Sequence, residues 1–137
     1  MPNTLTLLCF QQSRFFPDNT AHWGLFLREE GAERGTLFHA AKDSLTRGMT
    51  EPEAVPGINP RATKSLRASV EVASGLALDS GTLNNICNQV AENRRFDFIV
   101  NNCQRFCSQI LQRLVDDGTI TQAQFDALAI KGFRPLV

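Results

Sequence analysis

Two alternating apolar segments flank a charged turn near the start of the chain, and this arrangement limits the folds that are possible. Residues 21–27 read AHWGLFL and residues 36–41 read TLFHAA, and each alternates as a strand does. Between them, REEGAERG at 28–35 is charged and has two glycines, which is typical of a hairpin turn. We therefore expect two paired antiparallel strands that bring His22 and His39 near each other.

The other periodic segments predict an α+β domain, with an antiparallel sheet packed against helices. The further predicted strands are residues 4–10, 64–73 and 96–101, and the predicted helices start near Asp79 or Ser80, at Cys103 and at Thr121. Residues 42–63 hold three prolines and no periodic pattern, so we expect a partly ordered loop over the site. At 137 residues the chain fits a single domain, residues 1–137.

Charge and hydropathy exclude several classes of partner. Lys+Arg and Asp+Glu both number 14, so the formal net charge is zero and no nucleic-acid partner is expected. The first residues, MPNTLTLLCF, have no basic region and no long apolar run, so they do not resemble a signal peptide. Apolar runs elsewhere are too short to span a bilayer. These features predict a soluble, cytoplasmic protein without stable membrane insertion.

The four cysteines are Cys9, Cys87, Cys103 and Cys107. Their spacing suits neither a dense disulfide scaffold nor a CxxC pair, and cysteines one helical turn apart do not bridge easily. Cys87 and Cys9 are predicted to be core residues. No histidine lies close in sequence to Cys103 and Cys107, so we expect no metal and no other cofactor. Free thiols indicate a reducing compartment.

One cysteine occupies a special position, at the start of a predicted amphipathic helix within NNCQRFCSQIL, residues 101–111. Asn102 is the predicted N-cap, and Gly118 is predicted to end the helix. The apolar stripe of this helix consists of Phe106, Ile110 and Leu114, with Cys107, Leu111 and Val115 beside it. Cys103 heads this face, where the positive end of the helix dipole favours a thiolate.

Together, this cysteine and the only two histidines predict nucleophilic chemistry. Cys103 is the candidate nucleophile and His22 the candidate base. His39, on the adjacent strand, is the candidate group that orients the base. Backbone N–H groups at the helix start can form an oxyanion site, with Gln104 and Asn102 as supporting residues.

Each candidate also has a purely structural interpretation. Cys103 shares the apolar face of its helix and can be a core residue, and each histidine can be an ordinary strand residue. Gln104 can face solvent on the first turn. Trp23, next to His22, fits a core position, and beside the candidate base it is also a candidate substrate contact. The combination of the three chemical groups, rather than any one of them, favours a catalytic site.

The segments HWGLFL, FHAA and NNCQRFC resemble the circularly permuted papain-like (NlpC/P60) thiol enzymes. That superfamily includes the lecithin:retinol acyltransferase-like phospholipid acyltransferases and the PPPDE-type isopeptidases. In the acyltransferase branch, histidines on two successive strands precede an Asn-Cys-x-x-Phe motif, and His22, His39 and residues 102–106 match in order and type. FDFIVNNCQRF is also similar to the PPPDE pattern. The resemblance follows the order of elements over residues 4–115.

Two departures from the acyltransferase pattern argue against a phospholipid substrate. Glu-His usually follows the cysteine in that branch, whereas Gln104 and Arg105 stand here. Those enzymes also commonly carry a C-terminal membrane helix, which this sequence lacks.

The resemblance implies a permuted papain-like fold and a cysteine-dependent hydrolase or acyltransferase. It implies that an ester, thioester or amide is processed through a covalent thioester on Cys103, with His22 as general base. Two alternatives are a PPPDE-like cysteine peptidase or isopeptidase, and a catalytically inactive papain-like binding module. The implied partner is a small-molecule acyl substrate or a peptide.

Overall fold

A computed structural model describes residues 2–10, 22–43, 49–62, 66–91 and 103–131, and it confirms the α+β class. The strands are β1 (Asn3–Phe10), β2 (His22–Glu29), β3 (Gly35–Asp43), β4 (Met49–Ile58) and β5 (Leu66–Leu76). The helices are α1 (Ser80–Ala91), α2 (Cys103–Asp116) and α3 (Gln122–Ile130), with a short 3₁₀ helix, η1 (Pro60–Ala62). The predicted strand at 96–101 lies outside the described residues.

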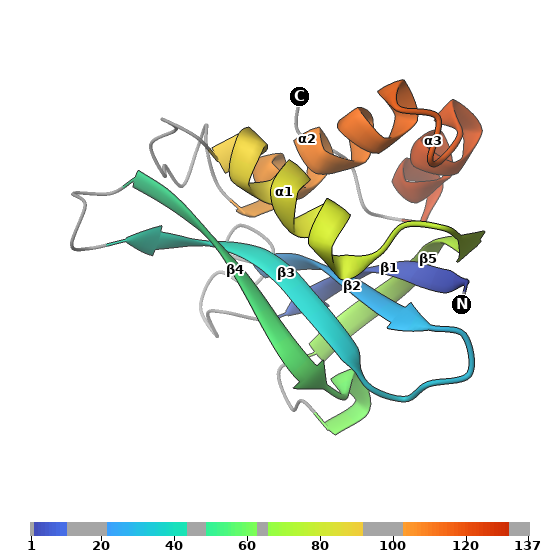
Figure 1. Ribbon diagram of the computed structural model, residues 1–137, viewed down its shortest axis with the longest axis horizontal. Coiled ribbons are helices and arrows are strands. Elements are labelled where there is room, and N and C mark those ends of the chain that lie inside the picture. Colours follow the sequence, from blue (N-terminus) through green and yellow to red (C-terminus); the bar gives the residue numbers. More distant parts are fainter. Residues whose placement is uncertain (1, 11–21, 44–48, 63–65, 92–102, 132–137) are drawn as a thin grey trace.

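The described strands form one sheet in the order β4-β3-β2-β1-β5, and the neighbours pair antiparallel (Figure 1). The predicted hairpin is confirmed, since Leu25 of β2 pairs with Phe38 of β3. Gly31 lies in its turn with a φ of 84°, a left-handed conformation that glycine adopts without a steric penalty. The sheet therefore places the strands that begin with His22 and contain His39 side by side.

The prediction of a loop at residues 42–63 is wrong for most of this segment, because β4 and η1 lie within residues 49–62. β4 pairs with β3, with Pro52 opposite Ala40. Proline has no N–H to donate and is confined to edge strands, and β4 is at one edge of the described sheet. The prolines of this segment therefore mark an edge strand, where the sequence pattern alone suggested irregular structure.

The helices cover one face of the sheet and form the main core with it (Figure 1). α2 packs on β2 and β3, α1 on β3 and β4, and α3 on β5. The sheet residues of this core include Leu5, Leu7, Trp23, Leu25, Leu27, Phe38, Val70 and Val72, and those of α2 are Phe106, Cys107, Ile110, Leu111 and Leu114.

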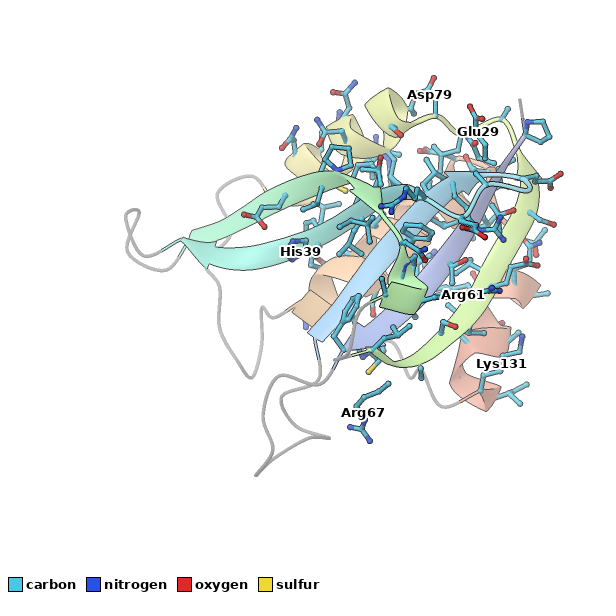
Figure 2. The ribbon with its side chains drawn as sticks, turned by 90° about the horizontal axis from the view of Figure 1, so that it is seen from below. Glu29, His39, Arg61, Arg67, Asp79 and Lys131 are labelled. Carbon is cyan, nitrogen blue, oxygen red and sulfur yellow. The ribbon has the colours of Figure 1, made fainter. Side chains whose placement is uncertain are left out.

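A second, smaller cluster occupies the opposite face of the sheet, which Figure 2 views. Its buried residues are Leu8, Phe10 and Phe26, and partly buried Leu37, Ile58 and Leu66 pack against them. The last two residues come from the end of β4 and the start of β5, so the two edge strands contribute to one cluster. This contact indicates that the sheet is curved, with the helix-free face concave.

The predicted helix starts are confirmed at the residues that cap them. Asp79 Oδ1 accepts a hydrogen bond from the Thr82 N–H at 2.7 Å at the start of α1, and this bond lowers the pKa of the Asp79 carboxyl. The predicted capping box is present at α3, where Thr121 and Gln124 bond reciprocally. Local capping chemistry, which sequence reveals well, therefore sets these boundaries.

Gly118 ends α2 in a Schellman motif, as the Gly118 N–H bonds Val115 O at 3.0 Å and the Thr119 N–H bonds Leu114 O at 2.9 Å. Its φ is 79°, so we expect Gly118→Ala to destabilise the protein by about 1–2 kcal/mol. Urea unfolding measures this. Gly81→Ala is the matched control: Gly81 is exposed in the first turn of α1 and has room for a Cβ, so alanine is expected to be neutral or stabilising. Equal losses in both variants would contradict the assignment.

Candidate functional site

The candidate nucleophile is the first residue of α2, as predicted. Three and seven residues later, Phe106 and Ile110 are 1% and 0% exposed, and they fix the face on which the helix packs. The predicted stripe is confirmed, because Leu114 is also fully buried. The structure therefore describes the backbone of Cys103, and it lies at the N-terminal end of a helix with a strongly apolar face.

This helix lies on the two strands that carry the histidines. α2 contacts β2 and β3. β2 starts and β3 ends at the same end of the sheet. In Figure 1, the first turn of α2 lies over this end. His22 is the first residue of β2, and its backbone pairs with that of Phe10. The backbone of Cys103 and that of His22 are therefore at the same end of the molecule, while Asn102 lies outside the described residues.

His39 is paired with a residue that the sequence analysis missed. The His39 Nε2 and Glu53 Oε2 atoms are 2.9 Å apart, and the two residues are direct partners on β3 and β4. Burial lowers the pKa of the His39 imidazole, and the Glu53 carboxylate partly offsets this by favouring the charged ring. Assigning residues 49–58 to a strand beside β3 would have revealed Glu53, whose type suits a histidine partner.

The alternation of side chains places His39 on the concave face of the sheet. Its neighbour Phe38 belongs to the main core beneath the helices, whereas Leu37 belongs to the cluster on the other face. The pairing of β2 with β3 ends at Leu25–Phe38, one residue before His39. The proximity of the two histidines therefore stays a prediction. The imidazole of His39, however, projects from the face opposite α2.

The remaining candidates divide into core residues and residues whose roles stay predictions. Trp23 is 5% exposed and sits in the main core, so its structural interpretation is confirmed and a substrate contact stays a prediction. Gln104 is the second residue of α2, and its supporting role stays a prediction, as does that of Asn102.

The other cysteines are core residues to different degrees. Cys87 is 1% exposed, and burial raises the pKa of its thiol to about 12. Cys107 is fully buried and Cys9 is partly buried against the main core. None of these three cysteines forms a disulfide. Cys87 therefore offers a protonated, shielded thiol for comparison with Cys103.

A cavity of about 430 Å³ opens on the concave face. Its apolar floor includes Leu8, Phe26 and Leu66, and Arg28, Glu33 and Arg61 stand among its polar lining residues. Figure 2 shows Arg61 on η1, apart from His39. The cavity includes neither His39 nor any residue of α2, so it is separate from the candidate site.

The described residues show neither a metal-binding cluster nor a membrane-spanning helix. Within the described ranges, no group of three or more His, Cys, Asp or Glu side chains could hold a metal ion. Across the same part of the chain, no helix has the length and apolar character needed to cross a membrane.

The His39–Glu53 pair predicts a measurable titration. We expect the pKa of His39 to lie below the usual 6.5, and Glu53→Gln to lower it further by removing the negative charge that favours the imidazolium. Since the folded pKa is the lower one, the associated stability is present above the unfolded value and lost as pH falls through the folded pKa. NMR titration of the imidazole resonances measures this, with His22→Gln to assign them. A His39 pKa that Glu53→Gln leaves unchanged would show that the pair does not form in solution.

The comparisons with known proteins identify a family without a described activity. Comparison with curated proteins and with solved structures gives no match. The profile of a family of unknown function, DUF6540, matches residues 8–121, which span β2 to β5 and the helices α1 and α2. Because the match covers most of the 137 residues, the chain belongs to this family of unknown function, DUF6540.

Proposed function

We propose that this protein is a Cys-His-His thiol hydrolase or acyltransferase with a permuted papain-like fold, in which Cys103 is the nucleophile. The observation that carries the proposal is the packing of α2, which begins at Cys103, on the two adjacent strands that contain His22 and His39. A helix N-terminus stabilises a thiolate, and a neighbouring imidazole can accept the thiol proton. The sheet end where β2 starts is the place where these groups would meet.

The proposed reaction proceeds through a thioester. His22 takes the proton of the Cys103 thiol, and the sulfur forms a bond to the acyl carbonyl of an ester, thioester or amide. Backbone N–H groups at the start of α2, with Gln104 and Asn102 as support, stabilise the oxyanion. As the tetrahedral species collapses, His22 gives its proton to the departing alcohol, thiol or amine. Water or an acceptor, deprotonated by His22, then attacks the thioester and releases Cys103.

The thioester itself is the most direct test. After incubation with p-nitrophenyl acetate and an acid quench, intact mass spectrometry is expected to show one added acetyl group on the wild-type protein. Cys103→Ala and His22→Ala are each expected to abolish turnover, and His39→Ala to weaken it. Cys9→Ala is the matched control, since it removes a thiol from a strand and leaves α2 intact. A stable adduct that persists in Cys103→Ala would contradict the proposal.

The substrate can also be a polypeptide, as in the PPPDE-type isopeptidases. Peptide and ubiquitin-like electrophilic probes, compared with small acyl probes, distinguish the two classes by which of them labels Cys103. Cys9, Cys87 and Cys107 form no disulfide, which supports the proposal of a reducing, cytoplasmic location. A small acyl compound or a peptide is therefore the proposed partner, without a metal or other cofactor.

A second candidate function is a catalytically inactive binding module. The position of His39 favours it, because this imidazole pairs with Glu53 and projects from the sheet face opposite α2. In such a module Cys103→Ser leaves binding of a partner intact, and no acyl donor forms a covalent adduct. The acetylation experiment therefore decides between the two functions.

A further inference from the structure

We propose that the cavity on the concave face of the sheet binds a small monoanion with an apolar body, namely a carboxylate that carries an apolar chain. The cavity is separate from the candidate site at Cys103, and the proposal does not depend on the thiol chemistry. Its volume of about 430 Å³ is within the range of small-molecule pockets, about 300–1,000 Å³.

The cavity forms where the chain crosses the concave face between β4 and β5. These strands are at opposite edges of the described sheet, and η1 lies in the segment that joins them. Figure 2 shows η1 over the strands of this face, and residues of η1 line the cavity together with residues of β1, β2 and β5. Asn59 holds the start of η1, because its Oδ1 accepts from the Arg61 N–H at 3.1 Å and its backbone O accepts from the Ala62 N–H at 3.0 Å. The crossing therefore forms a fixed wall above a floor of strands.

Apolar side chains form much of the cavity surface. Leu8 and Phe26 are buried beneath it, and Leu66 of β5 is partly buried against them. Pro60 of η1 and Ala32 of the hairpin turn add apolar surface to the walls. A hydrocarbon chain placed here would leave water and contact apolar atoms on several sides, which favours binding in proportion to the area buried.

Two guanidinium groups give the cavity its positive charge. Arg28 is half-buried on β2, and its Nη1 donates to the carbonyl oxygens of Glu29 at 3.5 Å and Ala32 at 3.3 Å. Both acceptors are neutral, so Arg28 has no carboxylate partner among the described residues. Arg61 is exposed, and within the described part of the chain its guanidinium makes neither a hydrogen bond nor an ion pair. A guanidinium binds a carboxylate through two parallel N–H···O bonds, so both groups can receive an anion.

The charge balance of the lining favours a monoanion. Among the described residues that line the cavity, Glu33 in the hairpin turn is the one acidic residue. Together with Arg28 and Arg61 it leaves one net positive charge, which a single carboxylate neutralises. A dianion such as a phosphate monoester exceeds this charge and is repelled by Glu33.

Three ligands, titrated into the full chain, test the proposal. Octanoate has both the charge and the apolar chain, octanol has the chain without the charge, and acetate has the charge without the chain. Octanoate is expected to bind saturably and to shift the backbone amide resonances of Gly31 and Ser69, which line the cavity. Octanol and acetate are each expected to bind at least about tenfold more weakly. Equal affinity for either of them, or octanoate shifts confined to the helices, would overturn the proposal.

Substitution of the arginines tests which groups hold the carboxylate. Arg61→Gln and Arg28→Gln are each expected to weaken octanoate binding about tenfold, because each removes a charged hydrogen-bond donor. Arg113→Gln is the matched control: Arg113 is an arginine of α2, on the other face of the sheet, and pairs with Asp117 at 3.3 Å. It is expected to leave the affinity unchanged, and circular dichroism checks the fold of each variant. An unchanged affinity in Arg61→Gln or Arg28→Gln would overturn the assignment.

Discussion

Iodoacetamide at pH 7 will alkylate Cys103 before any other cysteine of this chain, at a rate about 100-fold or more above that of Cys87. The thiolate is the reactive form. Burial raises the pKa of the Cys87 thiol to about 12, so this thiol is almost entirely protonated at pH 7, and the side chain is 1% exposed. Cys103 stands at the N-terminus of α2, where the helix dipole lowers the free energy of the thiolate.

Time-resolved intact mass spectrometry with peptide mapping gives the rate at each cysteine. Cys9 is the comparison for a partly buried thiol on a strand, without a helix dipole, and Cys107 for a buried thiol on the same helix. Cys103→Ser is expected to remove the fast phase and leave the slow ones. Should Cys103 react no faster than Cys9 or Cys87, its activation, and with it the proposed chemistry, would be excluded.

Phe106→Ala will lower the free energy of unfolding by about 3–5 kcal/mol. Phe106 is 1% exposed in the main core, on the first turns of the helix that begins at Cys103. Removing its ring leaves a cavity between α2 and the sheet, where the packed neighbours can relax only in part.

Urea unfolding, followed by circular dichroism, measures this loss. Ile130→Ala is the matched control, since Ile130 is 88% exposed on α3 and its truncation is expected to change stability by less than about 0.5 kcal/mol. A Phe106→Ala loss below about 1 kcal/mol would mean that the start of α2 does not pack on the sheet as described.

Elements with a local signal were predictable from the sequence. The hairpin of β2 and β3 follows from alternation around a charged, glycine-containing turn, and α2 follows from its apolar stripe and the glycine after it. The α3 start follows from the reciprocal bonds of Thr121 and Gln124. In each case the residues that specify the element are neighbours along the chain.

β4 and Glu53 were not predictable in this way. Pro52 and Pro56 break the alternation that marks a strand, and the strand forms because β3 offers a partner edge that tolerates proline. The pairing of Glu53 with His39 depends on that register, which is set by tertiary contacts. The packing of α2 on β2 and β3 likewise depends on tertiary contacts, which the sequence alone does not specify.

The prolines of β4 also bear on strand addition at this edge of the described sheet. An edge strand presents unpaired N–H and C=O groups that can template the addition of a strand from another molecule. Pro52 and Pro56 have no N–H to offer, and the exposed carboxylate of Glu53 adds charge to the same strand. β4 therefore resists the strand-by-strand growth that begins aggregates, and replacing its prolines with β-branched residues would remove that protection.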